Sequence, residues 1–215
     1  MTRSLLQIIL KVPGFLLAIS VHEYAHARMA YRLGDDTAEA AGRMTLEPWA
    51  HIDIIGAMML ILFGFGWARP VPVNAYRLRN PRKDMAKVAL AGPLANLVTA
   101  FFLEILTILL FTKFRFRSPL VYLPTILDLG AWINAGLAIF NLIPVPPLDG
   151  SRILEVYLPP SLQGLWDEFE RYGFIILVVF LVLGLITRFM APLLSAYMSF
   201  VESVGVRLSL FFWGL

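Results

Sequence analysis

The sequence predicts an all-α polytopic membrane protein, and three observations support this. The chain has 215 residues, of which 59% are hydrophobic and only 15% are charged. A soluble domain averages about 45–50% apolar and about 25% charged residues. The mean hydropathy is +0.73, and the apolar residues fall into runs close to the roughly 20 residues that cross a bilayer. We therefore expect a single domain, residues 1–215, with roughly four to six membrane segments in a lipid bilayer.

The first predicted membrane helix covers Pro13–Leu33 and ends at the turn signal Gly34–Asp36. The next apolar run, Ile52–Trp67, is short and interrupted by glycines, so we expect it to re-enter the membrane rather than cross it. Arg43–Glu47 alternates polar and apolar residues, and Val71–Val73 is a short stretch with apolar alternation, so both predict short strands. The sequence thus predicts a short re-entrant/β element between the first and second clear spans.

Further spans are predicted after this element. Val88–Phe111 is the second clear span, and Pro124–Ile143 is the third, stopped by a run of prolines. Phe174–Ile186 is expected to form the core of a fourth span. Ala191–Leu215 is apolar but contains two charged residues, so a fifth span and an interfacial helix both remain open.

Charge and cysteine content exclude several functions. The chain has no cysteine, which excludes a disulfide framework, a cysteine nucleophile and a thiolate zinc site. The net charge is +3. Basic residues of membrane proteins collect in their cytoplasmic loops, which accounts for this charge, so no nucleic-acid partner is expected. If Ile52–Trp67 does not cross, residues 34–87 lie on one side, which their basic residues make cytoplasmic. These residues are Arg43, Arg69, Arg77, Arg79, Arg82, Lys83 and Lys87, whereas Lys113, Arg115 and Arg117 fall on the other side and weigh against this orientation.

The motif His22-Glu23-Tyr24-Ala25-His26 lies within the first predicted span. Two histidines four residues apart on an α-helix lie about 40° apart around its axis, so both imidazoles can bind one metal ion. Glu23 lies next to them, where it can take a proton from a zinc-activated water. An ionisable cluster inside a membrane segment is expensive to bury and therefore indicates a functional site.

A catalytic zinc site needs a third protein ligand besides two histidines. Glu47 follows the second histidine at a separation that soluble zinc proteases use for a glutamate ligand. His51 would give a three-histidine site, and Asp149 follows the third predicted span. Spacing alone leaves these three residues open.

Several motifs together resemble the site-2 protease family of intramembrane zinc metalloproteases. They are the HExxH motif at His22–His26, Gly92-Pro93-Leu94-Ala95-Asn96, and the segment Asn141–Gly150 with the pattern N-x-x-P-x-P-x-L-D-G. Gly42–Leu46 and Pro70–Asn74 also resemble the compact prokaryotic members, which lack PDZ and CBS modules. The resemblance covers roughly residues 13–160, which we take as the catalytic core, followed by C-terminal membrane segments in residues 170–215.

The resemblance implies a role for each matching residue. His22, His26 and Asp149 would bind one Zn²⁺ per chain, Glu23 would be the general acid/base, and Asn141 would help to hold the substrate or the developing oxyanion. The protein would be a multi-pass enzyme of the cell membrane, and the orientation inferred from its basic residues would place the active site towards the cytoplasmic side. Its substrate would be a membrane protein, such as a single-span regulator, cut in or near its transmembrane segment.

Two other classes of function remain as alternatives. One is a non-proteolytic metal-binding membrane protein, although transporters of that kind usually contain repeated halves and no repeat is visible here. The other is a pseudoprotease scaffold, which would be expected to lack Glu23 or a metal ligand. The sequence retains all of these residues and therefore favours the enzyme.

Overall fold

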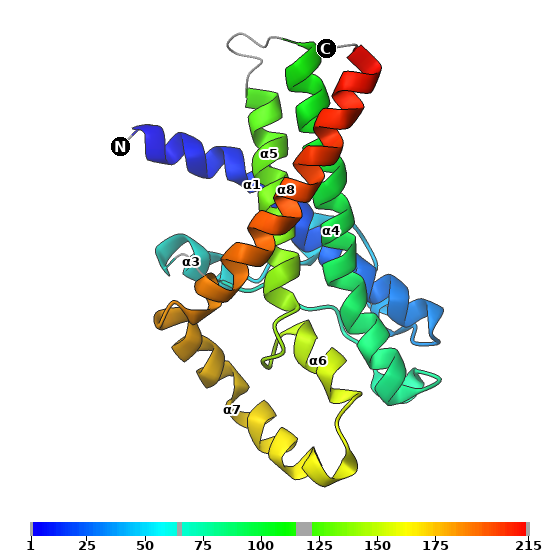
Figure 1. The fold of residues 1–215 in the computed structure, drawn as a ribbon. Coiled ribbons are helices and arrows are strands. Elements are labelled where there is room, and N and C mark those ends of the chain that lie inside the picture. The colour runs from blue at the N-terminus through cyan, green and yellow to red at the C-terminus, as the bar shows by residue number, and fades with distance from the viewer. Residues whose placement is uncertain (1, 64–65, 115–121, 214–215) are drawn as a thin grey trace. The chain divides into compact units, whose positions relative to one another are not determined.

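The computed structural model describes residues 2–63, 66–114 and 122–213, and every regular element in these ranges is helical (Figure 1). The long helices are α1 (Thr2–Arg32), α4 (Pro81–Lys113), α5 (Tyr122–Asn141), α7 (Gln163–Val182) and α8 (Leu185–Trp213). The short helices are α2 (Thr37–Ala40), α3 (Ile54–Phe63) and α6 (Asp149–Glu155), with 3-10 turns η1 (Pro48–Ala50), η2 (Ala75–Arg77) and η3 (Pro160–Leu162). The predicted all-α class is confirmed.

Among the described residues, four helices are long and apolar enough to cross a membrane. They comprise Leu5–Arg32 of α1 and the whole of α4, α5 and α8. The predicted spans at Pro13–Leu33, Val88–Phe111 and Pro124–Ile143 lie largely on three of these helices. Helices α1 and α4 continue through Pro13 and Pro93, because neighbouring helices in a membrane protein can compensate for the backbone hydrogen bond that a proline removes.

The β part of the predicted re-entrant/β element is wrong. The described residues contain no strand, and the region has only one isolated antiparallel bridge, between Ile52 and Ala68. Residues 43–47 and 71–73 are irregular, and the N–H of Val71 donates to the Glu23 side chain. The apolar run contains α3, whose ten residues span about 15 Å and cannot cross a hydrocarbon core of about 30 Å.

The predicted fourth span at Phe174–Ile186 is also wrong. Helix α7 ends at Val182 and α8 begins at Leu185, so that stretch straddles a helix break. Gly184 has φ +69° at this break, the left-handed conformation that favours glycine at the end of a helix. The fourth candidate span is instead Leu185–Trp213, whose length and composition suit a span for most of the stretch Ala191–Leu215. Leu215 itself lies outside the described residues.

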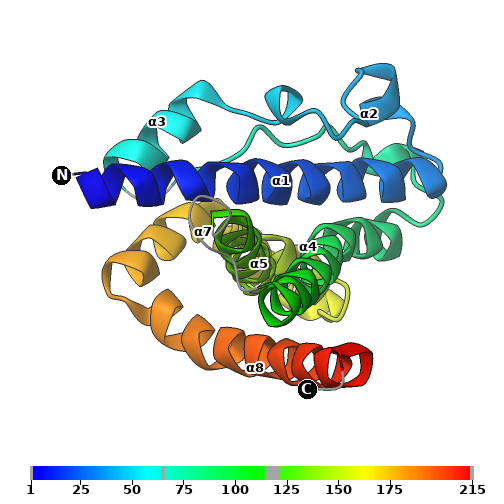
Figure 2. The same cartoon turned by 90° about the horizontal axis from the view of Figure 1, so that it is seen from above.

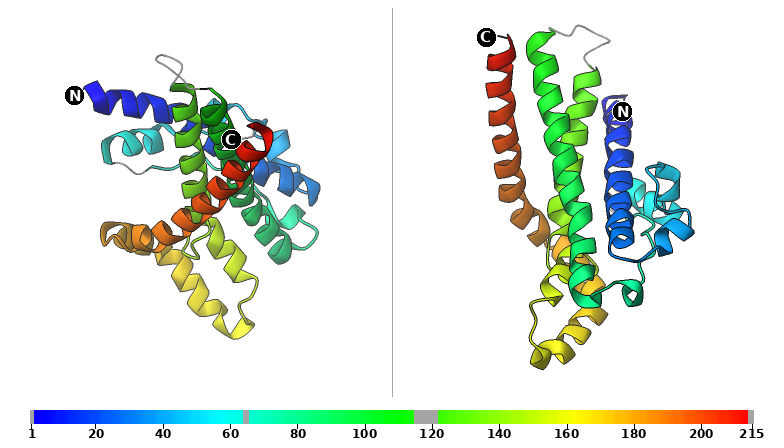
Figure 3. Two further views of the ribbon diagram at one scale, coloured as in Figure 1. Left: turned by 45° about the horizontal axis from the view of Figure 1, so that its top comes forward. Right: turned by 90° about the vertical axis from the view of Figure 1, so that its right-hand side faces the viewer.

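The chain divides into two compact units, and each is considered by itself. One unit comprises residues 1–18, 96–140 and 180–215. Its core is a cluster of small residues and one methionine on α4, α5 and α8, which lie side by side in this unit (Figure 3). The cluster members are Ala100, Ala131, Ala135 and Met198. Small residues allow close approach of membrane helices.

The other unit comprises residues 19–95 and 141–179. The C-terminal half of α1 packs here against α2 and the irregular chain that follows it (Figure 2). Ala27 of α1, Ala38 of α2 and Val71 form one buried cluster. Ala30, Leu78 and Val88 form a second cluster that fixes the start of α4 against α1. All the residues of the predicted metal site belong to this unit.

Candidate metal centre

His22 and His26 lie on one face of α1, one turn apart, as their spacing predicts. Their ring centroids are 4.5 Å apart and the ring planes are nearly perpendicular, at 89°. Both side chains are buried. The Nδ1 atom of His26 lies 2.7 Å from the carbonyl oxygen of Val88 on α4. A carbonyl can only accept, so Nδ1 carries the proton and donates it, which leaves Nε2 of His26 as the atom that can bind a metal ion.

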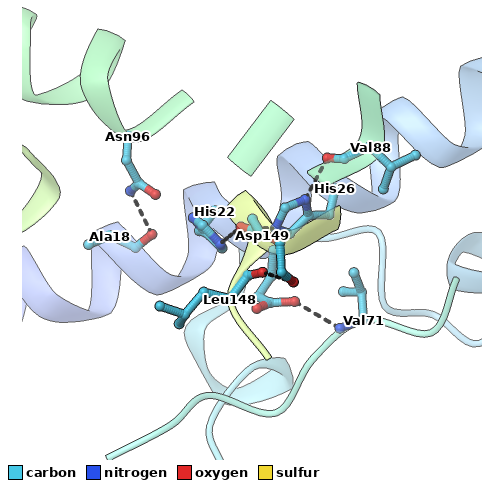
Figure 4. Close-up of polar contacts among 10 residues, drawn as sticks. Ala18, His22, His26, Val71, Val88, Asn96, Leu148 and Asp149 are labelled. Carbon is cyan, nitrogen blue, oxygen red and sulfur yellow. Dashed lines mark hydrogen bonds and ion pairs between the residues drawn. The ribbon is translucent and has the colours of Figure 1, made fainter. Parts of the chain in front are cut away.

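Asp149, the first residue of α6, lies beside the two histidines and is the third candidate ligand (Figure 4). Its Oδ2 atom lies 3.1 Å from Nε2 of His22 and 3.3 Å from Nε2 of His26. Two ligand atoms about 2.1 Å from one tetrahedral zinc ion lie about 3.4 Å apart. The two distances from Asp149 therefore match the spacing around a single zinc ion, and all three ligand atoms lie within 4.8 Å of one another.

The bonding state of Asp149 also fits a metal ligand. Oδ2 is buried and accepts no hydrogen bond from any of the described residues, despite the two nearby imidazoles. Burial raises the pKa of the Asp149 carboxyl, but the two histidines beside it outweigh burial and lower the pKa to about 2. The residue is therefore an ionised carboxylate at neutral pH, and a buried carboxylate oxygen without a donor is suited to a cation.

The local chain fixes where Asp149 lies. The segment between α5 and α6 buries Ile143, Val145 and Leu148, and the Ser151 hydroxyl donates to the Leu148 carbonyl at 2.7 Å. Gly150 packs against backbone, since a Cβ atom there would lie 2.3 Å from the Leu142 carbonyl oxygen. The first turn of α6 is thus held against the residues that directly follow α5.

Glu23 is buried beside the histidines and lies outside the group of ligand atoms. Its Oε2 atom accepts a hydrogen bond of 2.8 Å from the backbone N–H of Val71. This contact was not anticipated from the sequence. The sequence offered one hint of this contact, which is that Pro70–Asn74 is one of the segments that resemble the family.

The other candidate ligands lie apart from this centre. Within the described residues, His22, His26 and Asp149 form the only group of three His, Cys, Asp or Glu side chains close enough to share a metal ion. His51 is fully buried and its Nε2 lies 2.8 Å from the carbonyl oxygen of Thr45, which fits a structural histidine. Glu47 is exposed. Asn141 is half-buried at the last position of α5, and its role stays a prediction.

The fold and the site together define a helical membrane chain with an HExxH helix and a converging aspartate. Comparison with known proteins gives the same class. The family model described as Peptidase family M50 matches residues 118–184. YwhC of Bacillus subtilis is 40% identical over 185 residues, which cover 84% of each chain. Rip2 of Mycolicibacterium smegmatis is 31% identical over 217 residues, covering 94% of this chain and 80% of Rip2.

Both relatives are named, provisionally, as zinc metalloproteases. No solved structure matches the chain significantly. The chain belongs to peptidase family M50, the site-2 protease family that its motifs resemble. It is a protease, and its four apolar helices together with this membership indicate a multi-pass membrane protein.

Proposed function

We propose that the protein is a zinc-dependent intramembrane endopeptidase that hydrolyses peptide bonds in or near the transmembrane segments of membrane proteins. The observation that carries this proposal is the convergence of Nε2 of His22, Nε2 of His26 and Oδ2 of Asp149 in a buried position. Membership of family M50 and relatives named as zinc metalloproteases support the choice of zinc.

His22, His26 and Asp149 would hold one zinc ion and leave a fourth position for water. Zinc bound there supplies a Lewis acid, which polarises a carbonyl and lowers the pKa of water towards 7. The Val88 carbonyl supports this role, because it fixes the tautomer of His26 and aims Nε2 at the shared point. Two neutral imidazoles and one carboxylate are ligands that zinc accepts.

Glu23 would act as the general acid/base. Its carboxylate accepts the proton of the attacking water and later donates that proton to the leaving amine. The Val71 N–H binds Oε2 and leaves Oε1 for this transfer. Burial of Glu23 keeps bulk water from competing for the carboxylate.

The substrate would be a membrane protein, such as a single-span regulator. Its transmembrane helix must unwind locally before its carbonyls can be attacked. Asn141 would donate its side-chain amide to the substrate or to the developing oxyanion. Its location eight residues before Asp149, at the end of α5, is compatible with this role. No nucleic acid is part of this proposal.

The protein would lie in the cell membrane with its active site towards the cytoplasmic side. Helix α3 is too short to cross, so residues 34–87 stay on one side, and they hold seven of the chain's 18 basic residues. An excess of arginine and lysine marks a cytoplasmic segment.

A purified cleavage assay tests this function. The probe is a detergent-solubilised fusion in which one apolar helix of about 20 residues joins two soluble tags. We expect wild type to cut the fusion within the helix, as located by mass spectrometry of the products. Glu23→Gln should abolish cleavage while about one zinc per chain is retained.

Glu47→Gln serves as the matched control, because Glu47 is exposed and lies outside the metal centre. This variant should cut like wild type. Zinc-independent cleavage, or cleavage that survives in Glu23→Gln, would refute the mechanism. An intact fusion after incubation with zinc-loaded wild type would instead favour a metal-binding protein or a scaffold without protease activity.

A further inference from the structure

The chain from Arg69 to Asn74 runs in an irregular, extended path beside the metal centre and is held at three points. The N–H of Arg69 donates to the His51 carbonyl at 2.8 Å. The N–H of Val71 donates to Oε2 of Glu23 at 2.8 Å, and the N–H of Asn74 donates to Oδ2 of Asp35 at 2.7 Å. The hydrogen bond from the Val71 N–H is the one that reaches the proposed general acid/base, Glu23 (Figure 4).

Arg43 binds the same chain from its carbonyl side. Its Nη2 atom donates to the carbonyl of Arg69 at 2.8 Å and to the carbonyl of Pro70 at 3.3 Å. Burial lowers the pKa of Arg43, the charge of Arg69 lowers it further, and the charge of Glu23 raises it. The guanidinium is therefore close enough to both charged groups to be influenced by each of them, and it remains a cation at any pH at which proteins fold.

Peptide geometry links Arg43 to Glu23. The Pro70 carbonyl and the Val71 N–H belong to one peptide unit, which is planar and trans, so the two groups point in opposite directions. A cation on the carbonyl fixes the plane of that unit and thereby the direction of the N–H. The same charge polarises the peptide and strengthens the hydrogen bond that the N–H donates.

We propose that Arg43 is a positioning residue for catalysis, which holds the Pro70–Val71 peptide so that its N–H orients the Glu23 carboxylate. This inference rests on the proposed role of Glu23 as general acid/base. Without the hydrogen bond, the carboxylate can rotate about its terminal torsion, for which side chains have only a broad preference. A misplacement of about 1 Å in a reacting group can cost about 100-fold in rate.

The test compares Arg43→Gln and Arg43→Lys with Arg69→Gln. Arg69→Gln is the matched control, because it removes a neighbouring positive charge with an exposed side chain but keeps the backbone carbonyl that Arg43 binds. Four quantities are measured for each variant. They are zinc per chain, hydrogen–deuterium exchange of the peptide covering residues 66–79, and kcat and KM on the single-helix fusion.

We expect Arg43→Gln to keep its zinc, to exchange the amides of this peptide faster, and to lower kcat by about 10-fold or more with KM changed less than about 2-fold. Arg43→Lys should recover part of kcat, because an ammonium keeps the positive charge but is a flexible point charge without the planar, pre-organised donors of the guanidinium. Arg69→Gln should match wild type in exchange and in kcat. If Arg43→Gln proves too unstable to purify, the partial loss in Arg43→Lys carries the same test.

Three results would overturn the inference. Unchanged exchange in Arg43→Gln would mean that the arginine does not hold the segment. Faster exchange with an unchanged kcat would mean that the segment does not position Glu23. A higher kcat would mean that the segment restrains the enzyme instead. The exchange measurement needs no activity, so an inactive wild type would refute the proposed function and leave the contact between Arg43 and the segment testable.

Discussion

Gly92 on α4 packs directly against His26 on α1. A Cβ atom at position 92 would lie 2.5 Å from Nε2 of His26, and 2.8 Å from Cε1 of His22. Real Cβ atoms do not approach other atoms this closely, so the absence of a side chain at this position is what lets α4 cover the two imidazoles. The glycine of the Gly92–Asn96 motif therefore belongs to the metal centre, which its sequence context alone does not reveal.

Gly92→Ala should weaken zinc binding by about 10–100-fold, because the added methyl group displaces the histidines. Alanine is the better helix former by about 1 kcal/mol, so a weaker helix would not explain the loss. Zinc affinity is measured by competition with a chelator. Gly136→Ala on α5 is the control, since a Cβ atom there meets no atom within 4 Å, and it should bind zinc like wild type.

Gly150→Ala should lower the melting temperature and the zinc content together. A Cβ atom at this position would lie 2.3 Å and 2.5 Å from the carbonyl oxygens of Leu142 and Ile143. The start of α6 must then shift and carry Asp149 with it, at a cost of about 1–3 kcal/mol for overpacking. The Gly164→Ala variant on α7, with open space at its Cβ position, should lower neither measurement, and a stable, fully loaded Gly150→Ala would contradict the packing argument.

Removal of zinc should abolish proteolysis reversibly and destabilise the fold. A ligand that binds only the folded state adds about 2.7 kcal/mol at a concentration 100-fold above its dissociation constant. Wild type stripped with a chelator should therefore melt at a lower temperature and recover with added zinc. Magnesium, which prefers oxygen ligands in an octahedral site, should restore neither activity nor stability. Full activity in the stripped protein would count against a zinc enzyme.

Asn96 and Asn134 should be coupled in stability. Both side chains are fully buried. The Asn96 amide donates to the Asn134 side-chain carbonyl at 2.8 Å and to the Ala18 carbonyl at 2.9 Å. Hydrogen bonds between membrane helices contribute about 0.6 kcal/mol on average and up to about 1.7. A double-mutant cycle of Asn96→Ala and Asn134→Ala, measured by unfolding in detergent micelles, should give a coupling in this range, and strictly additive losses would show that the pair contributes nothing.

The sequence was sufficient for the helical class and for the HExxH geometry, since a fixed spacing on a helix sets the directions of His22 and His26. It could not rank Asp149 above His51 and Glu47, because the segment that carries each residue is positioned by tertiary packing. Only the resemblance to a family pointed to Asp149. The contact from Val71 to Glu23 and the clearance at Gly92 are long-range in the same way, and no local pattern predicts them.

The errors in the sequence-based fold also have physical causes. Val71 and Val73 give the apolar alternation of a strand, but the prolines at positions 70 and 72 cannot donate to a ladder. The segment instead makes single hydrogen bonds to Glu23 and Asp35. The apolar run at Phe174–Ile186 contains a break between two helices, which hydropathy cannot predict because it carries no information on backbone conformation. Gly184 was the available signal for that break.

The zinc content of wild type beside Asp149→Ala and His51→Gln tests the central claim most directly. His51→Gln keeps a polar side chain near the Thr45 carbonyl that His51 contacts and should retain about one zinc per purified chain, as wild type does. Asp149→Ala should lose the zinc, because only two protein ligands remain. Zinc retained in Asp149→Ala and lost in His51→Gln would show that the converging carboxylate is not the third ligand.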